Sequence, residues 1–248
     1  MNARAGNGRL EGRVAIVTGA SRGIGRATAL LFRAEGAVVI GWDLSWRERP
    51  GPDGAEDLRA EVDLRDAEAV RFEGGRVLDA AGRVDILVNN AGVTRGFVPA
   101  ESLSAPAWDL MLDTNARGAL HAVQAVVPAM KARGYGRILN VSSVLARHGF
   151  PGQTAYAASK AAIEGMTRVW AKEFGPWGIT VNAVAPGYVR TAMNEANGPE
   201  VERQVVERTP LGRLGESEDV ARALLFLASA DGSFVTGAVL PVDGGFSP

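Results

Sequence analysis

The sequence predicts a single doubly wound α/β domain, in which a parallel sheet is covered by helices on both faces. Short runs of apolar, often β-branched residues alternate with longer Ala-rich stretches of helical character. The short runs are apolar throughout, which is typical of parallel strands buried on both faces. The chain has 248 residues, of which 46% are hydrophobic, enough to bury the core of one large domain.

The elements follow one another in the order that such a fold requires. The expected strands are Val14–Val17, Ala37–Ile40, Val84–Val88, Ile138–Val141, Ile179–Val184 and a last strand before Asp243. The expected helices lie in the segment that ends near Glu35, and at Asp66–Ala81, Ala105–Ala132, Ala155–Phe174 and Glu218–Ser229, with Ser104 and Ser217 as N-caps of the third and the last.

Two segments depart from this alternation. Residues 1–11, rich in Gly, Asn and Arg, predict a flexible N-terminal tail, and residues 12–248 form the single domain. Ser45–Ala60 is rich in Pro, Gly and charge, and it offers at most a short helix where a full one is expected. We interpret it as a shortened connection, because one sheet has to continue on both sides of it.

The composition excludes several classes of function. The 27 basic and 28 acidic residues give a net charge of −1, which argues against a nucleic-acid or membrane-surface partner. The absence of cysteine rules out disulfides and thiol chemistry, and with only two histidines we expect no metal site. No apolar run approaches the ~18 residues of a membrane span, so we expect a cytoplasmic protein.

A glycine-rich turn joins the first strand to the first helix. It comprises Gly19, Ser21, Arg22, Gly23, Ile24 and Gly25, with the spacing G-x-x-x-G-x-G. Glycines at this place let a pyrophosphate approach the helix N-terminus, whose free N–H groups favour an anion. An isolated match of this kind is often only a turn, but the strand and the helix around it favour a dinucleotide site.

Asp43 lies at the tip of the second strand, eighteen residues after Gly25. A carboxylate there accepts hydrogen bonds from the adenosine ribose hydroxyls and repels a 2′-phosphate, which favours NAD over NADP. Arg22 instead favours NADP, because an arginine in the turn is able to bind the 2′-phosphate. NADP therefore stays possible, with NAD the better-supported cofactor.

Tyr156 and Lys160 are four residues apart in a predicted helix, so they share one face. A nearby ammonium favours the phenolate, which makes the tyrosine a candidate acid/base for hydride transfer to or from an alcohol. Ser143 follows a strand and is a candidate donor to the substrate oxygen. The alternative is that Tyr156 and Lys160 are only an exposed pair on the helix surface. The chain has only three lysines and three tyrosines, so the occurrence of one of each a helical turn apart favours a site.

These residues, taken together, resemble the short-chain dehydrogenase/reductase family. The motifs occur in order over about Gly12–Gly245: the glycine turn, Asn89-Asn90-Ala91-Gly92, Ser143 with Tyr156-x3-Lys160, and Pro186-Gly187. The resemblance implies a Rossmann-type fold, a homotetramer and a catalytic tetrad of Asn115, Ser143, Tyr156 and Lys160. Asn115 would hold a water that links Lys160 to solvent.

The same resemblance implies further contacts with the cofactor. Asp63 and Leu64 would lie against the adenine, Asn90 near the cofactor, and Val189 and Thr191 at the nicotinamide carboxamide. Tyr156 and Lys160 would also touch the nicotinamide ribose. The segment near 190–213 would form a lid over a small-molecule substrate.

The sequence leaves three functions open. The first is an NAD-linked dehydrogenase/reductase of a small hydrophobic or cyclic secondary alcohol or ketone. The second is an NADPH-dependent 3-oxoacyl thioester reductase acting on acyl-carrier-protein substrates, which the overall resemblance favours. Asp43 weighs against it, as do Gly134 and Trp177, which stand where such enzymes commonly carry basic residues. The third, a dinucleotide sensor without catalysis, conflicts with the intact Ser143, Tyr156 and Lys160.

Overall fold

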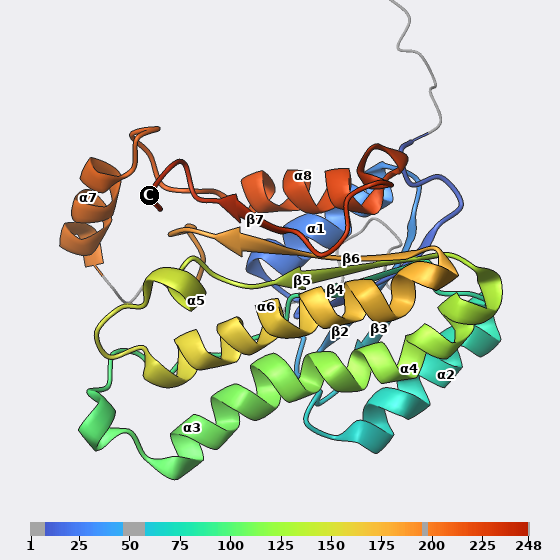
Figure 1. The fold of residues 1–248 in the computed structure, drawn as a ribbon, viewed down its shortest axis with the longest axis horizontal. Coiled ribbons are helices and arrows are strands. Elements are labelled where there is room, and N and C mark those ends of the chain that lie inside the picture. The colour runs from blue at the N-terminus through green and yellow to red at the C-terminus, as the bar shows by residue number, and fades with distance from the viewer. Residues whose placement is uncertain (1–7, 47–57, 195–197, 248) are drawn as a thin grey trace, which may run out of the picture.

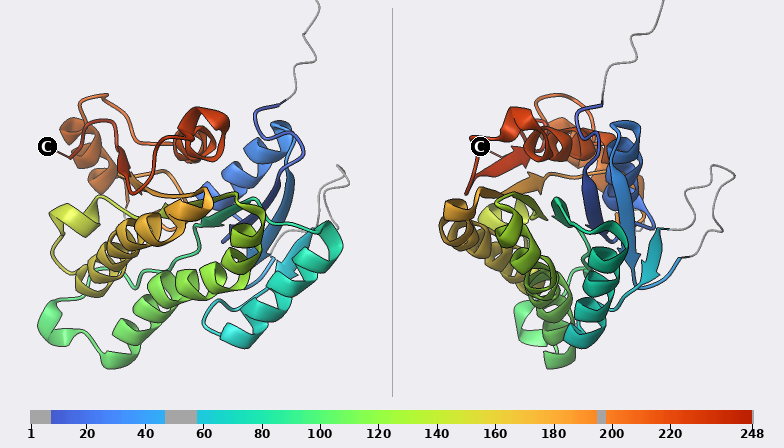
Figure 2. Two further views of the ribbon diagram at one scale, coloured as in Figure 1. Left: turned by 45° about the vertical axis from the view of Figure 1, so that its right-hand side comes forward. Right: turned by 90° about the vertical axis from the view of Figure 1, so that its right-hand side faces the viewer.

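A computed structural model describes residues 8–46, 58–194 and 198–247. Seven parallel strands form one sheet in the order β3-β2-β1-β4-β5-β6-β7. Helices cover both faces of the sheet (Figures 1 and 2), which confirms the predicted doubly wound α/β domain of Rossmann type. No helix in these ranges combines the length and the apolar character that crossing a bilayer demands.

The strands and helices have the following bounds. The strands are β1 Val14–Thr18, β2 Val38–Asp43, β3 Arg59–Glu61, β4 Ile86–Asn89, β5 Gly136–Val141, β6 Ile179–Pro186 and β7 Val239–Val242. The helices are α1 Gly23–Ala34, α2 Ala67–Ala81, α3 Ala105–Leu112, α4 Gly118–Arg133, α5 Leu145–His148, α6 Thr154–Phe174, α7 Gly198–Arg208 and α8 Ser217–Ala228.

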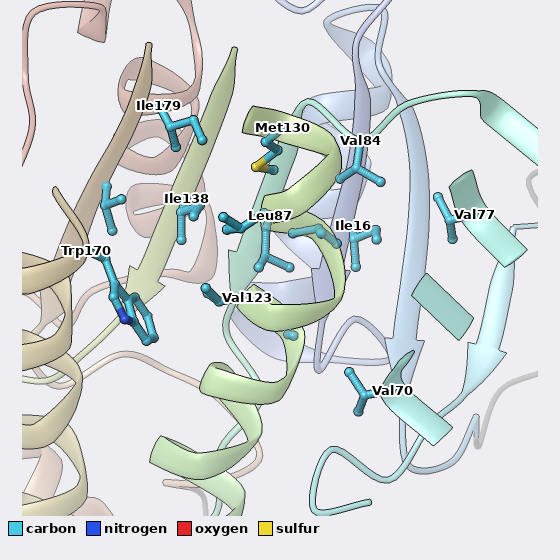
Figure 3. Packing of buried hydrophobic residues seen from close by; sticks show 14 of the residues in the cluster. Ile16, Val70, Val77, Val84, Leu87, Val123, Met130, Ile138, Trp170 and Ile179 are labelled. Carbon is cyan, nitrogen blue, oxygen red and sulfur yellow. The ribbon is translucent and has the colours of Figure 1, made fainter. Parts of the chain in front are cut away.

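Each face of the sheet carries its own hydrophobic core, because successive strand residues point to opposite faces. Ile16, Leu87 and Ile138 pack with α2, α4 and α6, where Val123 and Trp170 are buried (Figure 3). The residues next to them in the strands, such as Val17, Val88 and Leu139, pack on the other face with α1 and α8. The two cores explain why β1, β4, β5 and β6 are buried along their whole length.

The strand order reverses at β1, which lies between β2 and β4. The chain runs from β1 toward β3 on one side and continues from β4 to β7 on the other. The loops that follow β1 and β4 therefore diverge and leave a crevice at the carboxyl ends of the strands, where doubly wound folds bind ligands. The glycine turn follows β1, and Asn90 follows β4.

The structure adds a short strand at the end of Ser45–Ala60, the segment interpreted as a shortened connection. Arg59–Glu61 form the short strand β3, which pairs with Gly41–Asp43, so the connection contributes to the sheet. Trp46 lies across Gly41 and donates a hydrogen bond from Nε1 to the carbonyl of Ala60 at 3.2 Å. Residues 47–57 of this segment lie outside the described residues.

The structure describes part of the segment expected as an N-terminal tail, from residue 8 onward. Residues 1–7 of the expected tail lie outside the described residues, but Leu10 is buried and its N–H bonds to the carbonyl of Glu35 at 2.9 Å. Arg9 forms an ion pair with the same glutamate. Residues 8–11 therefore pack against the end of α1, because Leu10 completes the core on that face.

The long helix expected at Ala105–Ala132 contains a break in its regular geometry. Ser104 caps its start as predicted, accepting from the N–H of Ala107. Asp113–Arg117 then form a π-helical turn between α3 and α4, with Asn115 in it. Such widened turns occur often at functional sites, and no composition signal announces them.

The last helix begins one residue earlier than predicted. Glu216, rather than Ser217, is the N-cap of α8: its side chain accepts from the Asp219 N–H, and the Asp219 carboxylate accepts from the Glu216 N–H at 2.9 Å. This reciprocal capping box satisfies two N–H groups, whereas Ser217 is already helical. The helices α5 and α7 were not expected from the sequence.

Candidate active site

The glycine turn between β1 and α1 is close-packed, and two of its glycines leave no room for a side chain. A Cβ at Gly25 would stand 2.1 Å from the carbonyl oxygen of Gly19, and a Cβ at Gly19 would stand 2.8 Å from the Cα of Ala91. Gly19 and Gly23 also have φ of +66° and +54°, which glycine adopts most easily. The backbone of the glycine turn therefore bends tightly, and no side chains at Gly19, Gly23 and Gly25 cover it.

The N-terminus of α1 is open to an anion. Arg22 is its N-cap residue but makes no side-chain capping bond, and no acidic residue lies in the first turn. Ser21 and Arg22 precede the helix, and Ile24 packs toward the core formed with α8. Uncapped N–H groups and a positive helix end beside bare glycines fit the pyrophosphate of a dinucleotide.

Asp43 lies beside this turn, as the sequence predicts. Its Oδ2 accepts a hydrogen bond from the Ser21 N–H at 2.9 Å, which fixes the carboxylate next to the turn. The carboxylate is partly exposed at the end of β2. It thus occupies the side of the crevice on which the ribose of a dinucleotide bound to the turn is expected to lie.

Asn90 holds the turn in place from the neighbouring strand. Its side-chain Nδ2 donates to the carbonyls of Thr18 and Gly19 at 2.9 and 3.1 Å. The Thr18 hydroxyl in turn accepts from the N–H groups of Asn90 and Ala91. Asn90 therefore lies at the crevice beside β1, and its side-chain amide helps to shape the glycine turn. The sequence reasoning assigned no role in the site to Thr18, although Thr18 directly precedes Gly19 in the motif.

Asp63 and Leu64 lie after β3, at the same end of the sheet. The Arg65 guanidinium hydrogen-bonds the Asp63 carboxylate and holds its pKa below the usual range. Leu64 is buried, and its carbonyl accepts from Nδ1 of His121 at 2.8 Å. His121 on α4 thus fixes this loop against the helix.

Val189 and Thr191 follow β6 and reach back to the crevice. Val189 is buried and pairs with Gly215 in a short bridge. The Thr191 side chain lies close to the glycine turn: a Cβ built on Gly23 would be 3.5 Å from it. The structure therefore brings the start of the 190–213 segment next to the glycine turn, and α7 lies within that segment. Residues 195–197 lie outside the described residues.

Ser143, Tyr156 and Lys160 come together from β5 and α6. Ser143 follows the end of β5, and its hydroxyl is close enough to the Tyr156 phenol to lower the pKa of that phenol. Lys160 lies one turn after Tyr156 on α6, with Nζ 5.7 Å from the centre of the tyrosine ring. Nζ also donates to the carbonyl of Val141 at 2.8 Å, which fixes the lysine against the end of β5.

Burial sets the protonation of this group. Burial raises the pKa of Tyr156, and the Ser143 hydroxyl opposes this by lowering it. Burial also lowers the pKa of Lys160 to about 8. The pKa of Tyr156 is therefore raised, and the Ser143 hydroxyl, not Lys160, is the group that opposes this rise. The phenol stays protonated at neutral pH and is able to donate a proton.

Asn115 is held in the π-helical turn by three hydrogen bonds. Its Nδ2 donates to the Val93 carbonyl at 3.0 Å and to Ser159 Oγ at 2.9 Å, and its Oδ1 accepts from the Val93 N–H at 2.7 Å. A Cβ on Gly92 would lie 3.2 Å from Oδ1 and 3.3 Å from Lys160 Nζ. Asn115 and Lys160 therefore face the same glycine, and all four members of the predicted tetrad lie in one site.

Gln153 is a residue of this site that the sequence reasoning missed. It is buried just before α6, donates from Nε2 to the Gly96 carbonyl at 3.0 Å and accepts from the Thr94 hydroxyl at 3.3 Å. The Val98 N–H adds a bond to the Gly152 carbonyl at 2.9 Å. These contacts join the loop after β4 to the loop before α6. The only sequence signal is that a polar residue precedes the helix of Tyr156.

Apolar side chains gather in the loops beyond these strands. Phe97 and Phe150 lie with ring centres 5.5 Å apart, and both are half exposed. Met193 is exposed in the segment after β6. α5 and α7 lie at the same end of the sheet (Figure 1), so these apolar side chains belong to loops at the ends of the strands that carry the site.

The fold and the site define a class of protein. A bare turn at a helix N-terminus in the switch crevice accepts a dinucleotide, and a protonated tyrosine with a serine and a lysine serves a reacting oxygen. Within the described ranges no group of three or more His, Cys, Asp or Glu side chains is placed to hold a metal ion. The protein is an oxidoreductase that uses a nicotinamide dinucleotide to act on hydroxyl or keto groups.

Comparison with known proteins agrees with this class. A family model described as enoyl-(acyl carrier protein) reductase matches residues 19–247. The chain belongs to the short-chain dehydrogenase/reductase family. It is 44% identical to 3-oxoacyl-(acyl-carrier-protein) reductase FabG of Thermotoga maritima, over 96% of this chain and 98% of that protein.

Two further relatives extend the comparison. FabG of Pseudomonas aeruginosa, also a 3-oxoacyl-(acyl-carrier-protein) reductase, is 41% identical over 95% of this chain and 98% of its own. The (2S)-((R)-hydroxy(phenyl)methyl)succinyl-CoA dehydrogenase subunit BbsD of Thauera aromatica is 40% identical over 96% of this chain and 98% of its own. All three similarities run along nearly the whole chain.

Proposed function

We propose that this protein reduces the keto group of 3-oxoacyl thioesters to a hydroxyl group. The observation that carries the proposal is the similarity, over 96% of the chain, to a 3-oxoacyl-(acyl-carrier-protein) reductase. The relative named as a (hydroxy(phenyl)methyl)succinyl-CoA dehydrogenase supports the same chemistry, at a hydroxyl group of an acyl thioester, with coenzyme A as the carrier. This reverses the order in which the sequence alone ranks the hypotheses, since the secondary alcohol dehydrogenase came first there.

The chemistry follows from the residues of the site. A nicotinamide dinucleotide, when bound, supplies the hydride that the keto carbon receives. Ser143 donates a hydrogen bond to the keto oxygen and stabilises the negative charge that develops on it. Tyr156 transfers its proton to that oxygen, which completes the hydroxyl group. Lys160, with its pKa near 8, is mostly protonated at pH 7 and stabilises the phenolate that remains.

Asn115 supports the return of a proton to Tyr156. Its side chain lies beside Lys160 at Gly92 and is locked by Val93 and Ser159. In this proposal it holds a water molecule that links Lys160 to solvent, so that the tyrosine is protonated again after each turnover.

We infer that NADH is the preferred cofactor, with NADP(H) as the alternative. Asp43 is fixed beside the glycine turn by the Ser21 N–H, where a carboxylate and a 2′-phosphate would repel each other. Separate fluorescence titrations with NADH and NADPH test this inference. Asp43→Ala is expected to reduce the difference between the affinities for NADH and NADPH. Tighter binding of NADPH by the unchanged protein would contradict the role given to Asp43.

The substrate is tested with two panels that separate the hypotheses. One contains 3-oxobutanoyl thioesters of coenzyme A and of acyl-carrier protein, and the other contains cyclic and open-chain ketones with the matching alcohols. Turnover is followed at the nicotinamide absorbance, with Tyr156→Phe as the inactive control. Faster turnover of ketones than of thioesters would favour the alcohol dehydrogenase. Cofactor binding without any turnover would favour a sensor.

We further propose a cytoplasmic homotetramer with the 190–213 segment as the substrate lid. Apolar side chains exposed on three elements support assembly: Val169 on α6, Phe226 on α8 and Leu240 on β7. Sedimentation equilibrium tests the assembly, and Phe226→Glu with Leu240→Glu is expected to shift it to smaller species. A monomer in the unchanged protein would rule this part out.

A further inference from the structure

Glu164 is a buried carboxylate that the mechanism above does not use. It lies on α6, one turn beyond Lys160, and its side chain is 5% exposed. A buried carboxylate is costly unless charged and hydrogen-bonding partners surround it. The partners of Glu164 therefore show what this charge holds together.

Both oxygens of Glu164 are engaged. Oε2 accepts from Arg147 Nε at 3.2 Å and from Arg168 Nη2 at 3.1 Å. Oε1 accepts from the hydroxyl of Ser142 at 3.2 Å. The same hydroxyl lies 3.3 Å from the Lys160 carbonyl. Glu164 thus connects three places in the chain.

Two of these places flank Ser143. Ser142 precedes it directly, and Arg147 lies on α5, the four-residue helix that begins two residues after it. The peptide before Ser143 and the helix after it are therefore both fastened to α6, which carries Tyr156 and Lys160. The third partner, Arg168, is on α6 itself, so its bond to Glu164 lies within one helix.

We propose that Glu164 is a positioning residue that holds Ser143 at the distance from Tyr156 that proton transfer and carbonyl polarisation require. It acts through Ser142 and Arg147 and touches neither substrate nor cofactor. Small displacements of catalytic groups have large effects on rate, so this anchoring is worth about 10- to 100-fold in turnover. The kinetic part of the test rests on the proposed 3-oxoacyl thioester reduction.

The two arginines provide a matched pair of variants. Arg147 and Arg168 contact the same oxygen at nearly the same distance, and their side chains are 48% and 50% exposed. Arg147→Gln removes a link between α5 and α6, whereas Arg168→Gln removes an equal charge within α6. We expect Arg147→Gln to lower kcat for a 3-oxobutanoyl thioester about 10-fold, and Arg168→Gln to leave it within about 2-fold of the parent.

Two further variants separate positioning from simple loss of stability. Glu164→Gln is expected to lower kcat by about 10- to 100-fold with the dissociation constant of NADH unchanged. Arg147→Lys, which keeps the cation, is expected to restore most of the rate. Equal losses in Arg147→Gln and Arg168→Gln would overturn the proposal, as would full activity in Glu164→Gln.

A second readout does not depend on the substrate. Tyr135→Phe with Tyr188→Phe leaves Tyr156 as the only tyrosine, so the near-ultraviolet absorbance of its phenolate reports its titration. Glu164→Gln in this background is expected to raise the pKa of Tyr156, because the Ser143 hydroxyl that lowers it moves away.

The direction of that change is decisive. Removal of a negative charge by itself makes a phenolate easier to form, so a purely electrostatic role of Glu164 predicts a lower pKa of Tyr156. A pKa that falls or stays constant would overturn the proposal. If no thioester is reduced while this titration shifts upward, the proposed function fails and the positioning role of Glu164 stands.

Discussion

Replacement of Lys160 by methionine is expected to change how the stability of the protein depends on pH. Lys160 is 4% exposed, and burial lowers its pKa from 10.5 to about 8. Methionine has a similar length and carries no charge. The variant therefore removes the cost of burying an ammonium group while it fills nearly the same volume, at the loss of the hydrogen bond to Val141.

The magnitude follows from the change in pKa. Each pKa unit corresponds to about 1.4 kcal/mol, so burial of the charge costs about 3 kcal/mol. Below pH 8 the lysine is protonated in both the folded and the unfolded chain, and the folded state bears this cost. Between about pH 8 and pH 10.5 the folded state releases the proton first, so the contribution of Lys160 to stability rises with pH.

Urea unfolding at pH 7 and near pH 10.5, at one protein concentration and without added cofactor, measures the effect. The free energy of unfolding of Lys160→Met, relative to the unchanged protein, is expected to be higher by about 3 kcal/mol at pH 7 than near pH 10.5. The exposed Lys172 gives the control, because Lys172→Met is expected to show no such change. Equal differences at both pH values would refute the burial of a charged Lys160.

Three other predictions concern the site. Tyr156→Phe is expected to lower turnover by about 100- to 10,000-fold with cofactor binding retained, and unchanged turnover would exclude Tyr156 as the acid. Gly25→Ala is expected to abolish cofactor binding measured by fluorescence, since its Cβ would meet the Gly19 carbonyl at 2.1 Å, whereas Gly75→Ala, where a Cβ meets nothing within 4 Å, keeps it. Phe150→Asn is expected to raise KM about 10-fold for long-chain 3-oxoacyl thioesters and little for 3-oxobutanoyl thioesters. An equal rise in KM for both would argue against a contact between Phe150 and the acyl chain of the substrate.

Much of the site was predictable because its residues lie at the ends of predictable elements. The runs that form β1, β2 and β5 are largely apolar, so their ends mark where Gly19, Asp43 and Ser143 lie. Helical spacing then places Tyr156 and Lys160 on one face of α6. The carboxyl ends of parallel strands share one edge of the sheet, which makes the meeting of these residues a consequence of the pattern.

Other features depend on contacts between distant segments, and no local pattern reports those. The short strand β3 forms by pairing with β2, although its own sequence is polar. The π-helical turn of Asn115 and the bonds of Gln153 join the loop after β4 to α3, α4 and α6. Glu164 looks like any glutamate on a helix until Ser142 and Arg147 are found against it.

The sequence by itself determined the fold class and the family resemblance, because periodicity and motif spacing are local properties of the chain, and the resemblance implied the four residues of the tetrad. Only the tertiary structure decided the protonation of the site. Helical spacing suggests a lysine that depresses the pKa of its neighbour, but burial raises the pKa of Tyr156 and lowers that of Lys160. Burial is a property of the packed molecule, since it depends on which segments exclude water from α6.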